Sequence, residues 1–494
     1  MQITNYNSVE KRIAPLRIIY FCTMARRKQN RKIFLETPVT DAGAKGKAIA
    51  HAPDGRVIFL TNAVPGDVVD IQTTKRRKSY YEGQAIRFHT LSRKRTQPAC
   101  NHFEVCGGCK WQHMNYEYQL HYKQQEVANN LERIGHLELP NLLPIVGSKQ
   151  QYNYRNKMEF SFSANKWLTQ EEIDAGTVIK EKRALGFHIA GMWDKILDIT
   201  QCHLQPEPSN AIRNGIREFA IKNDLSFFDT RKQEGLLRTL MIRTTTTGEV
   251  MVLVQFFKEE AHNRKLLLDY IKNTYPEITS LLYVINNKGN DTIYDQEVIC
   301  YYGKTYITEI MEGLQFRITA KSFYQTNPEQ AYELYKITRD FAELTGTETV
   351  YDLYTGTGTI AQFVAKKVKK VVGVEAIPEA IDAAIENAQL NKITNTHFEV
   401  GDMKKVFNDA FIERHGLPDI VITDPPRDGM HQDVVKQLLN ITPEKIVYVS
   451  CNSATQARDL ALLNDHYKIT RVQPVDMFPQ THHVENVVLL EKRS

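Results

Sequence analysis

The sequence predicts a multidomain α/β protein that begins with a small β-barrel and ends with a doubly wound α/β domain. Three observations support this prediction. The chain has 494 residues, which is enough for about three domains. Short strand-like runs separated by turns fill residues 31–92. Strands and helices alternate along residues 321–494, as in a mostly parallel sheet with helices on both faces.

The N-terminal barrel is predicted by closely spaced strands and turns. Residues 57–60 and 68–71 are short apolar runs, and Asp54-Gly55 is a hairpin signal. Several short strands within about sixty residues are typical of an OB-like barrel. Residues 1–30 precede it as an N-terminal extension. Met24 opens a Lys/Arg-rich start, so the segment before it is interpreted as over-extended translation.

Residues 93–320 mix helix and strand and are predicted to form a central α/β domain. Residues 116–134 have helical periodicity, whereas residues 158–162 and 250–254 resemble strands.

The C-terminal domain shows the most regular alternation, so we expect ligands at the carboxyl ends of its strands. The predicted elements are strands 349–353, 371–374, 419–423, 446–450 and 486–490 and helices 358–369, 378–391, 430–440 and 454–463.

Charge is concentrated near the start of the chain. Residues 24–100 contain 16 Lys and Arg against six Asp and Glu, a net charge of +10, whereas residues 101–494 carry −7. Within the barrel, residues 75–81 place four cations beside two tyrosines, a combination that suits RNA because cations pair with phosphates and rings stack on bases. The alternative is a solvated charged hairpin or tail. RNA is therefore the expected partner.

No apolar run approaches the ~18–20 residues of a membrane span, so we expect a cytoplasmic protein with no membrane partner. The run at residues 18–22 is too short for a signal peptide. The seven cysteines are an odd number, which argues against a disulfide framework.

A glycine-containing segment, residues 352–359, links a predicted strand to a helix. Its glycines allow a ligand to approach the backbone closely. Glu375 ends the next strand, where a carboxylate can bind ribose hydroxyls. The spacing Gly356-x-Gly358 also fits a dinucleotide fold, but Asp352 four positions earlier favours the positively charged S-adenosylmethionine.

Two further strand ends carry reactive side chains. Asp424 follows one strand in the sequence Asp-Pro-Pro-Arg, and Cys451 follows the next. Glu485 begins the last strand, after His482 and His483, which we interpret as polar turn residues. The alternatives are a strand-terminating turn at Asp424 and a buried, inert cysteine at Cys451.

A cysteine and a carboxylate beside a methyl-donor site suggest methylation of uracil at carbon 5. That carbon is a weak nucleophile until a thiolate adds at carbon 6, and a base must afterwards remove the carbon-5 proton. Cys451 would need thiolate character, which we expect the polar edge of the cleft to supply.

Three cysteines, Cys100, Cys106 and Cys109, lie within ten residues, and Cys202 is a candidate fourth ligand. A tight trio with a distant fourth suits an iron–sulfur cluster better than zinc, whose ligands usually come as two close pairs. Zinc remains the alternative.

Together these motifs resemble the RNA (uracil-5-)-methyltransferases of the RumA type, which act on 23S ribosomal RNA. The resemblance covers nearly the whole chain from about residue 30. It implies a TRAM barrel, a [4Fe-4S] cluster on the four cysteines and a class I methyltransferase domain. It implies Cys451 as nucleophile and Glu485 as base. The residues that it places at the S-adenosylmethionine site are Gln325, Tyr354, Thr359, Glu375, Asp402 and Asp424.

The chain departs from the family pattern at two positions. Thr355 replaces a frequent cysteine that is not the nucleophile, and Thr359 stands where asparagine is frequent. We expect a monomer that methylates 23S rRNA. The alternatives are a tRNA target, a non-catalytic RNA-binding protein, and a redox enzyme that uses a flavin or dinucleotide with the cluster.

Overall fold

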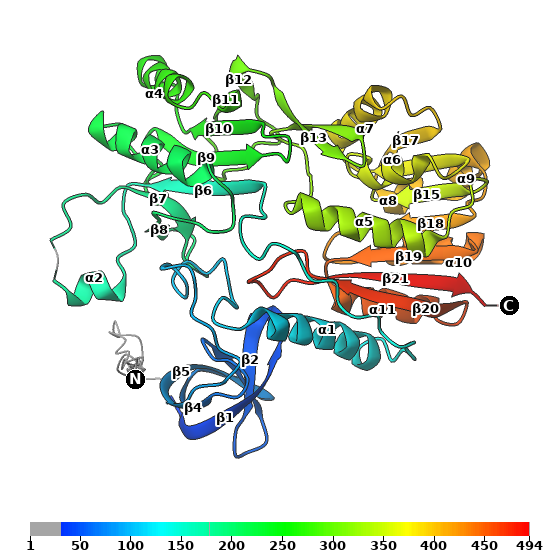
Figure 1. Ribbon diagram of the computed structural model, residues 1–494, viewed down its shortest axis with the longest axis horizontal. Helices are drawn as coiled ribbons and strands as arrows, with labels where there is room; N and C mark the ends of the chain where they lie inside the picture. Colours follow the sequence, from blue (N-terminus) through cyan, green and yellow to red (C-terminus); the bar gives the residue numbers. More distant parts are fainter. Residues whose placement is uncertain (1–30, 177, 494) are drawn as a thin grey trace, which may run out of the picture. The chain divides into compact units, whose positions relative to one another are not determined.

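A computed structural model describes residues 31–176 and 178–493 (Figure 1). The predicted N-terminal extension, including the segment before Met24, lies outside the described residues. The chain divides into two compact units. One contains the barrel, and the other contains residues 98–112 and everything from residue 116 onward. Among the described residues, none of the helices combines the length and the apolar character needed to cross a membrane.

The predicted barrel is confirmed as a closed five-stranded barrel with strand order β1-β2-β3-β5-β4. Alternating residues of its strands point inward, and Ile58, Leu60, Val69, Ile71 and Tyr81 are fully buried. Its strands are β1 (Ile33–Gly43), β2 (Lys47–His51), β3 (Val57–Thr61), β4 (Val68–Arg76) and β5 (Tyr80–Thr90).

The central part is built on a seven-stranded sheet with strand order β12-β11-β10-β9-β6-β7-β8. Helices α3 and α4 share one apolar core with this sheet, and Figure 1 shows them next to one another at the left of strands β9 to β12. The strands are β6 (Lys157–Ser163), β7 (Ala184–His188), β8 (Ile196–Asp198), β9 (Leu237–Thr244), β10 (Val250–Phe256), β11 (Ile278–Ile285) and β12 (Ile299–Gly303), and the helices are α2 (Gln170–Asp174), α3 (Ser209–Lys222) and α4 (Ala261–Thr274).

The C-terminal part contains a second seven-stranded sheet, with order β17-β16-β15-β18-β19-β21-β20. Strands β15 to β19 are parallel, and β21 runs antiparallel to both of its neighbours, β19 and β20. The strands are β15 (Thr349–Leu353), β16 (Lys370–Glu375), β17 (Thr396–Val400), β18 (Ile420–Thr423), β19 (Lys445–Ser450), β20 (Tyr467–Val475) and β21 (Glu485–Lys492).

Successive residues of these strands alternate between two apolar cores, one on each face of the sheet. Helices α5 and α6 cover one face, and α1, α9, α10 and α11 cover the other, which confirms the doubly wound prediction. The β13–β14 ribbon packs beside α7. The remaining elements are α1 (Tyr116–Arg133), β13 (Tyr306–Met311), β14 (Leu314–Thr319), α5 (Pro328–Ala342), α6 (Thr359–Ala365), α7 (Pro378–Leu390), α8 (Met403–Val406), α9 (Asp409–His415), α10 (Gln432–Ile441) and α11 (Ser453–Leu463).

Candidate active site

Strand register brings Cys451 and Glu485 together. Strands β19 and β21 are antiparallel, and Ser450 pairs with Asn486. The next positions along the two strands are Cys451 and Glu485, so these residues face one another, and directly opposed residues of an antiparallel pair project to the same side. Glu485 is only 6% exposed, whereas Cys451 is half-buried.

The carboxylates around Cys451 hold its proton in place. Burial, together with the charges of Glu485 and Asp424, raises the pKa of Cys451 to about 11, against the opposing effect of Arg427. The prediction that this edge supplies thiolate character is therefore wrong for the protein alone. A buried thiol beside two acids is protonated at neutral pH.

Glu485 is a buried carboxyl group whose pKa lies near neutral pH. Burial raises the pKa of Glu485 to about 8, Asp424 adds to the rise, and Arg427 counteracts it. A carboxyl group with a pKa near the working pH can accept a proton and release it again. Arg427 follows directly after the two prolines of the Asp424 turn, and its positive charge acts on both Cys451 and Glu485.

Asp424 follows β18, a strand that lies between β19 and β15, the strand that leads into the glycine segment. The Asp424 backbone N–H donates to the carbonyl oxygen of Leu353 at 3.3 Å. Burial raises the pKa of Asp424 to about 7, and Asp352 contributes to the rise. Tyr335 of α5 is 6% exposed, and its pKa is raised by burial and then by these carboxylates.

The glycine segment leaves room for a ligand beside the backbone. Gly356 and Gly358 both have positive φ, at 56° and 71°. A Cβ at Gly358 would come within 2.8 Å of the Ala384 Cβ, whereas a Cβ at Gly356 would meet no atom within 4 Å. Gly358 is therefore required by packing, and Gly356 borders open space.

The side chain of Asp352 holds the same segment through hydrogen bonds. Its Oδ2 accepts hydrogen bonds from the Thr355 hydroxyl at 2.5 Å and from the Ala361 N–H at 3.0 Å. Its Oδ1 is buried without a hydrogen-bond partner. An unpaired buried acceptor costs stability unless a ligand donates to it, so Asp352 fits a site for a cationic or N–H-bearing ligand.

The other predicted cofactor residues also follow the parallel strands. Glu375 ends β16, and its Oε2 accepts from the Gly356 N–H at 3.2 Å. Asp402 follows β17 and caps α8 through the Lys404 N–H. Tyr354 follows β15 with φ 64°. All three therefore lie at the carboxyl edge of the sheet.

Two predicted contacts are less direct. The Thr359 hydroxyl is 3.3 Å from the Thr357 hydroxyl, so its polar group already has a protein partner. Gln325 precedes α5, and its carbonyl oxygen accepts from Asn156 Nδ2 at 3.1 Å. Asn327 caps α5 and donates to the Met477 carbonyl oxygen at 3.0 Å, which ties this segment to the loop before Glu485.

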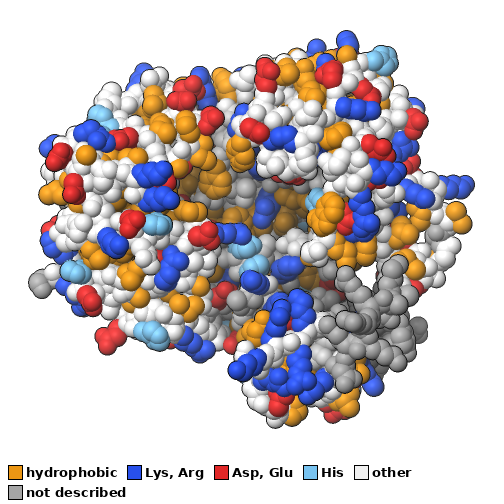
Figure 2. Space-filling model, turned by 180° about the vertical axis from the view of Figure 1, so that it is seen from behind, with side chains coloured by type: hydrophobic (Ala, Val, Ile, Leu, Met, Phe, Trp, Pro, Cys, Tyr) orange, Lys and Arg blue, Asp and Glu red, His pale blue; other side chains and the backbone are white. Residues whose placement is uncertain are grey.

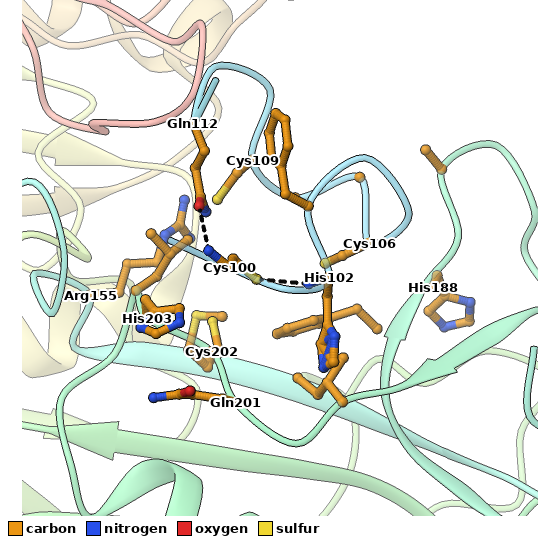
Figure 3. A pocket seen from close by; sticks show the side chains of 18 residues that line it. Cys100, His102, Cys106, Cys109, Gln112, Arg155, His188, Gln201, Cys202 and His203 are labelled. Carbon is orange, nitrogen blue, oxygen red and sulfur yellow. Dashed lines mark hydrogen bonds between the residues drawn. The ribbon is translucent and has the colours of Figure 1, made fainter. Parts of the chain in front are cut away.

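The four predicted metal ligands border a single cavity of about 340 Å³ (Figure 3). Their side chains come from the 100–109 loop and from the segment after β8, and the Cys100 N–H donates to Gln112 Oε1 at 3.1 Å. The cysteines are Cys100, Cys106, Cys109 and Cys202.

The thiols in this cavity oppose one another's ionisation. Burial raises the pKa of Cys106 to about 11 and that of Cys109 to about 12, and the other thiols add to both shifts. In the described part of the chain, no group of three or more His, Cys, Asp or Glu side chains is arranged to hold a metal ion.

The cysteine loop is bonded to the loop that leads to Glu485. The backbone N–H groups of Lys110 and Trp111 donate to the Gln480 carbonyl oxygen at 2.9 and 3.0 Å. The side chain of Gln119 on α1 bonds both the backbone and the side chain of Gln480, each at 3.0 Å. A fully buried ion pair, Lys123 Nζ to Asp476 Oδ1 at 2.6 Å, joins the same helix to the same loop.

Two residues of this site had no assigned role before the fold was known. Arg427 lies in the Asp-Pro-Pro-Arg segment, so its position beside Asp424 was a usable signal. Tyr335 lies on a helix about ninety residues before Asp424, and no local pattern points to it.

Comparison with known proteins identifies the family. The family model described as tRNA (uracil-5-)-methyltransferase matches residues 244–493. An RNA methyltransferase of Bacteroides thetaiotaomicron is 55% identical over 453 residues, covering 91% of this chain and all of the relative. One of Porphyromonas gingivalis is 54% identical over 463 residues, covering 92% of this chain and 99% of the relative.

A solved structure is similar over almost the same extent. The tRNA (uracil-54, C5)-methyltransferase of Pyrococcus abyssi, in complex with S-adenosyl-L-homocysteine, is 29% identical with a TM-score of 0.71. The similarity covers 92% of this chain and 100% of the Pyrococcus abyssi chain. The chain therefore belongs to the RNA (uracil-5-)-methyltransferase family and is an S-adenosylmethionine-dependent RNA methyltransferase.

Proposed function

We propose that this enzyme methylates carbon 5 of a uridine in 23S rRNA through a covalent adduct between Cys451 and carbon 6. The observation that carries the proposal is the β19–β21 register, which opposes a thiol and a buried carboxyl group at one strand end. Uracil C5 methylation requires these two groups and requires them close together.

In the proposed reaction the Cys451 thiol loses its proton to solvent, its sulfur adds to carbon 6, and carbon 5 becomes nucleophilic. Carbon 5 then takes the methyl group from the second substrate, S-adenosylmethionine, and S-adenosylhomocysteine leaves. Glu485 accepts the carbon-5 proton, and the electrons of that bond restore the carbon 5–carbon 6 double bond as the sulfur leaves. One proton is released overall. Arg427 supports both the thiolate and the Glu485 carboxylate through its charge.

We propose that the methyl donor lies along the carboxyl edge of the parallel strands. The open space beside Gly356 and the unpaired Oδ1 of Asp352 support this placement. The proposed contacts are Gln325, Tyr354, Thr359, Glu375, Asp402 and Asp424.

We propose that Cys100, Cys106, Cys109 and Cys202 hold a [4Fe-4S] cluster. Four thiols on one cavity, with no carboxylate among the lining residues, match the donor set of such a cluster. A bound cluster would supply positive charge that stabilises the thiolates. Its role is structural, because the cysteine loop is bonded to the loop that leads to Glu485.

We propose that residues 31–92 form a TRAM-like RNA-binding barrel, followed by a cluster domain over residues 93–320 and the methyltransferase domain over residues 321–494. Residues 75–78 of the barrel are four consecutive exposed cations, and Lys and Arg side chains gather on the barrel in Figure 2. Phosphate contacts of this kind raise affinity without selecting a base.

The experiment that tests the substrate uses methyl-labelled S-adenosylmethionine with unmodified 23S rRNA and unmodified tRNA in parallel. Transfer of label to 23S rRNA, mapped by mass to 5-methyluridine, is the expected result. Transfer only to tRNA would establish the second candidate, which the name of the Pyrococcus abyssi structure favours. Absence of 5-methyluridine in both would contradict the proposal.

A further inference from the structure

A second cavity, of about 230 Å³, lies in the central domain away from the proposed catalytic residues. It is bordered by strands β6, β7 and β9 and by three loops. The lining residues on which the argument depends are Trp193, Phe228, Thr230, Arg238, Asn290 and Asp291.

Trp193 is the most unusual residue of this cavity because it is 65% exposed. It lies in the tight turn between β7 and β8, which is closed by a hydrogen bond from the Ile189 N–H to the Lys195 carbonyl oxygen at 2.8 Å. An indole left in water forgoes the stabilisation that burying a large apolar side chain contributes. Core packing therefore does not explain Trp193, whereas an exposed ring on a fixed turn can stack on a ligand.

The opposite side of the cavity is held rigid. Phe228 is 4% exposed, and the guanidinium of Arg238 lies 4.7 Å from its ring centroid. The same guanidinium donates to the carbonyl oxygens of Asn286 and Lys288 at 2.9 and 2.7 Å. Arg238 thus fixes both the aromatic wall and the loop that contributes Asn290 and Asp291. A preformed site loses less entropy on binding.

The polar groups of the cavity match a base edge better than a phosphate. Asp291 carries an exposed carboxylate, which repels phosphate and accepts hydrogen bonds from amino and imino groups. Asn290 and Thr230 provide further amide and hydroxyl groups. Three N–H donors of Arg238 bind backbone carbonyl oxygens and hold its guanidinium against the protein, which makes it a poor site for an anion.

We propose that this cavity binds one unpaired nucleobase of the RNA substrate, stacked on Trp193, with its hydrogen-bonding edge towards Asp291. The ligand is a base with an amino group, other than the uracil that is methylated. The inference rests on the proposed RNA substrate. His188 borders both this cavity and the cysteine cavity (Figure 3). Enzymes that extrude a target base commonly read flanking nucleotides in this way.

The first test measures binding of a single-stranded RNA of about 12 nucleotides, a length within known single-strand site sizes, to the full chain. Trp193→Ala should weaken binding about tenfold and raise KM without lowering kcat, since one base–aromatic stack is lost. Trp193→Phe should retain most of the affinity. The matched control is Tyr302→Ala, because Tyr302 is 44% exposed on β12, the opposite edge of the same sheet.

The second test pairs these variants with RNAs that lack a single base at successive positions. At one position, removal of the base should reduce the affinity of the wild-type protein about tenfold. The same removal should cause no further loss of affinity in Trp193→Ala. Equal losses in both proteins at every position, or wild-type affinity in Trp193→Ala, would overturn the inference. These binding readouts do not depend on methyl transfer, so a failure of the proposed reaction would show separately as a lack of 5-methyluridine.

Discussion

The end of β19 and the cysteine cavity present the same reactive side chain in two different environments. Burial raises the thiol pKa in both places. In the cavity the further contributions come from other thiols, whereas beside Cys451 they come from Glu485 and Asp424. The comparison teaches that neighbours, more than burial, decide what a cysteine can do. Thiols that repel one another suit a shared metal cluster, and a thiol opposite a carboxyl group suits addition followed by proton removal.

The largest effect should come from removing the isolated thiol. Cys451→Ala should lower methyl transfer roughly 10⁴-fold or more, because loss of a nucleophile removes the covalent route. Its iron content should equal that of the wild-type enzyme. Cys300→Ala is the matched control, since Cys300 lies on β12 outside the cysteine cavity, and it should behave as wild type. Near-normal turnover in Cys451→Ala would remove the distinction between the two regions.

Replacing a cysteine of the cavity should remove iron, whereas replacing Cys451 should not. Anaerobically purified wild-type protein should contain about four irons per chain, and Cys202→Ser should lose most of the iron and its visible absorbance. Iron analysis and absorbance spectra provide the measurement, with Cys300→Ser as control. Stoichiometric zinc in the wild-type preparation would show that the four thiols serve a different metal.

The buried ion pair joins α1 to the loop that leads to Glu485. Lys123→Met should destabilise the protein by about 3–5 kcal/mol, because it leaves the Asp476 carboxylate buried without its cation. Denaturant unfolding measures this cost. Lys265→Met, which removes an exposed partner of Asp269, should cost at most about 1 kcal/mol. Equal small effects would show that the helix–loop connection contributes little.

A smaller effect concerns the charge of Glu485. Its pKa is raised from 4.5 to about 8, so the folded protein keeps this proton to a higher pH than the unfolded chain. The carboxyl therefore disfavours folding increasingly as pH rises from about 4.5 to 8. The free energy of unfolding of Glu485→Gln should therefore exceed that of the wild type by more at pH 8.5 than at pH 4. The change in this difference between the two pH values should be on the order of 2–4 kcal/mol. A difference that does not change with pH would contradict the burial of an ionisable group there.

Much of the fold followed from the sequence because its central strands are buried on both faces. Strand 349–353 was predicted with its observed bounds, and the other four predicted C-terminal strands differ from the structure by one or two residues at an end. Strands β17 and β20 were not predicted, since they form the two edges of the sheet and lack a continuous apolar run. The helix predicted over 358–369 ends at Ala365, because the chain must turn to start β16. Just before that strand, the backbone N–H of Lys369 donates to the carbonyl oxygen of Glu348.

The candidate site was predictable where residues directly follow strands. Cys451, Asp424 and Glu375 were found in this way. The antiparallel insertion of β21 beside β19, which opposes Glu485 to Cys451, depends on long-range pairing that no local pattern encodes. The raised pKa of Cys451 could not be predicted for the same reason, because it depends on carboxylates that only the folded sheet brings near.

The central claim is that Cys451 and Glu485 act one after the other on the same uracil, and trapping tests it most directly. Glu485→Gln, incubated with unmodified RNA and S-adenosylmethionine, should add Cys451, receive the methyl group and stall with the carbon-5 proton in place. A denaturing gel should then show a slow-migrating protein–RNA band. Cys451→Ala combined with Glu485→Gln should show none. Absence of the band from a Glu485→Gln enzyme that still binds RNA, or its persistence without Cys451, would contradict the account.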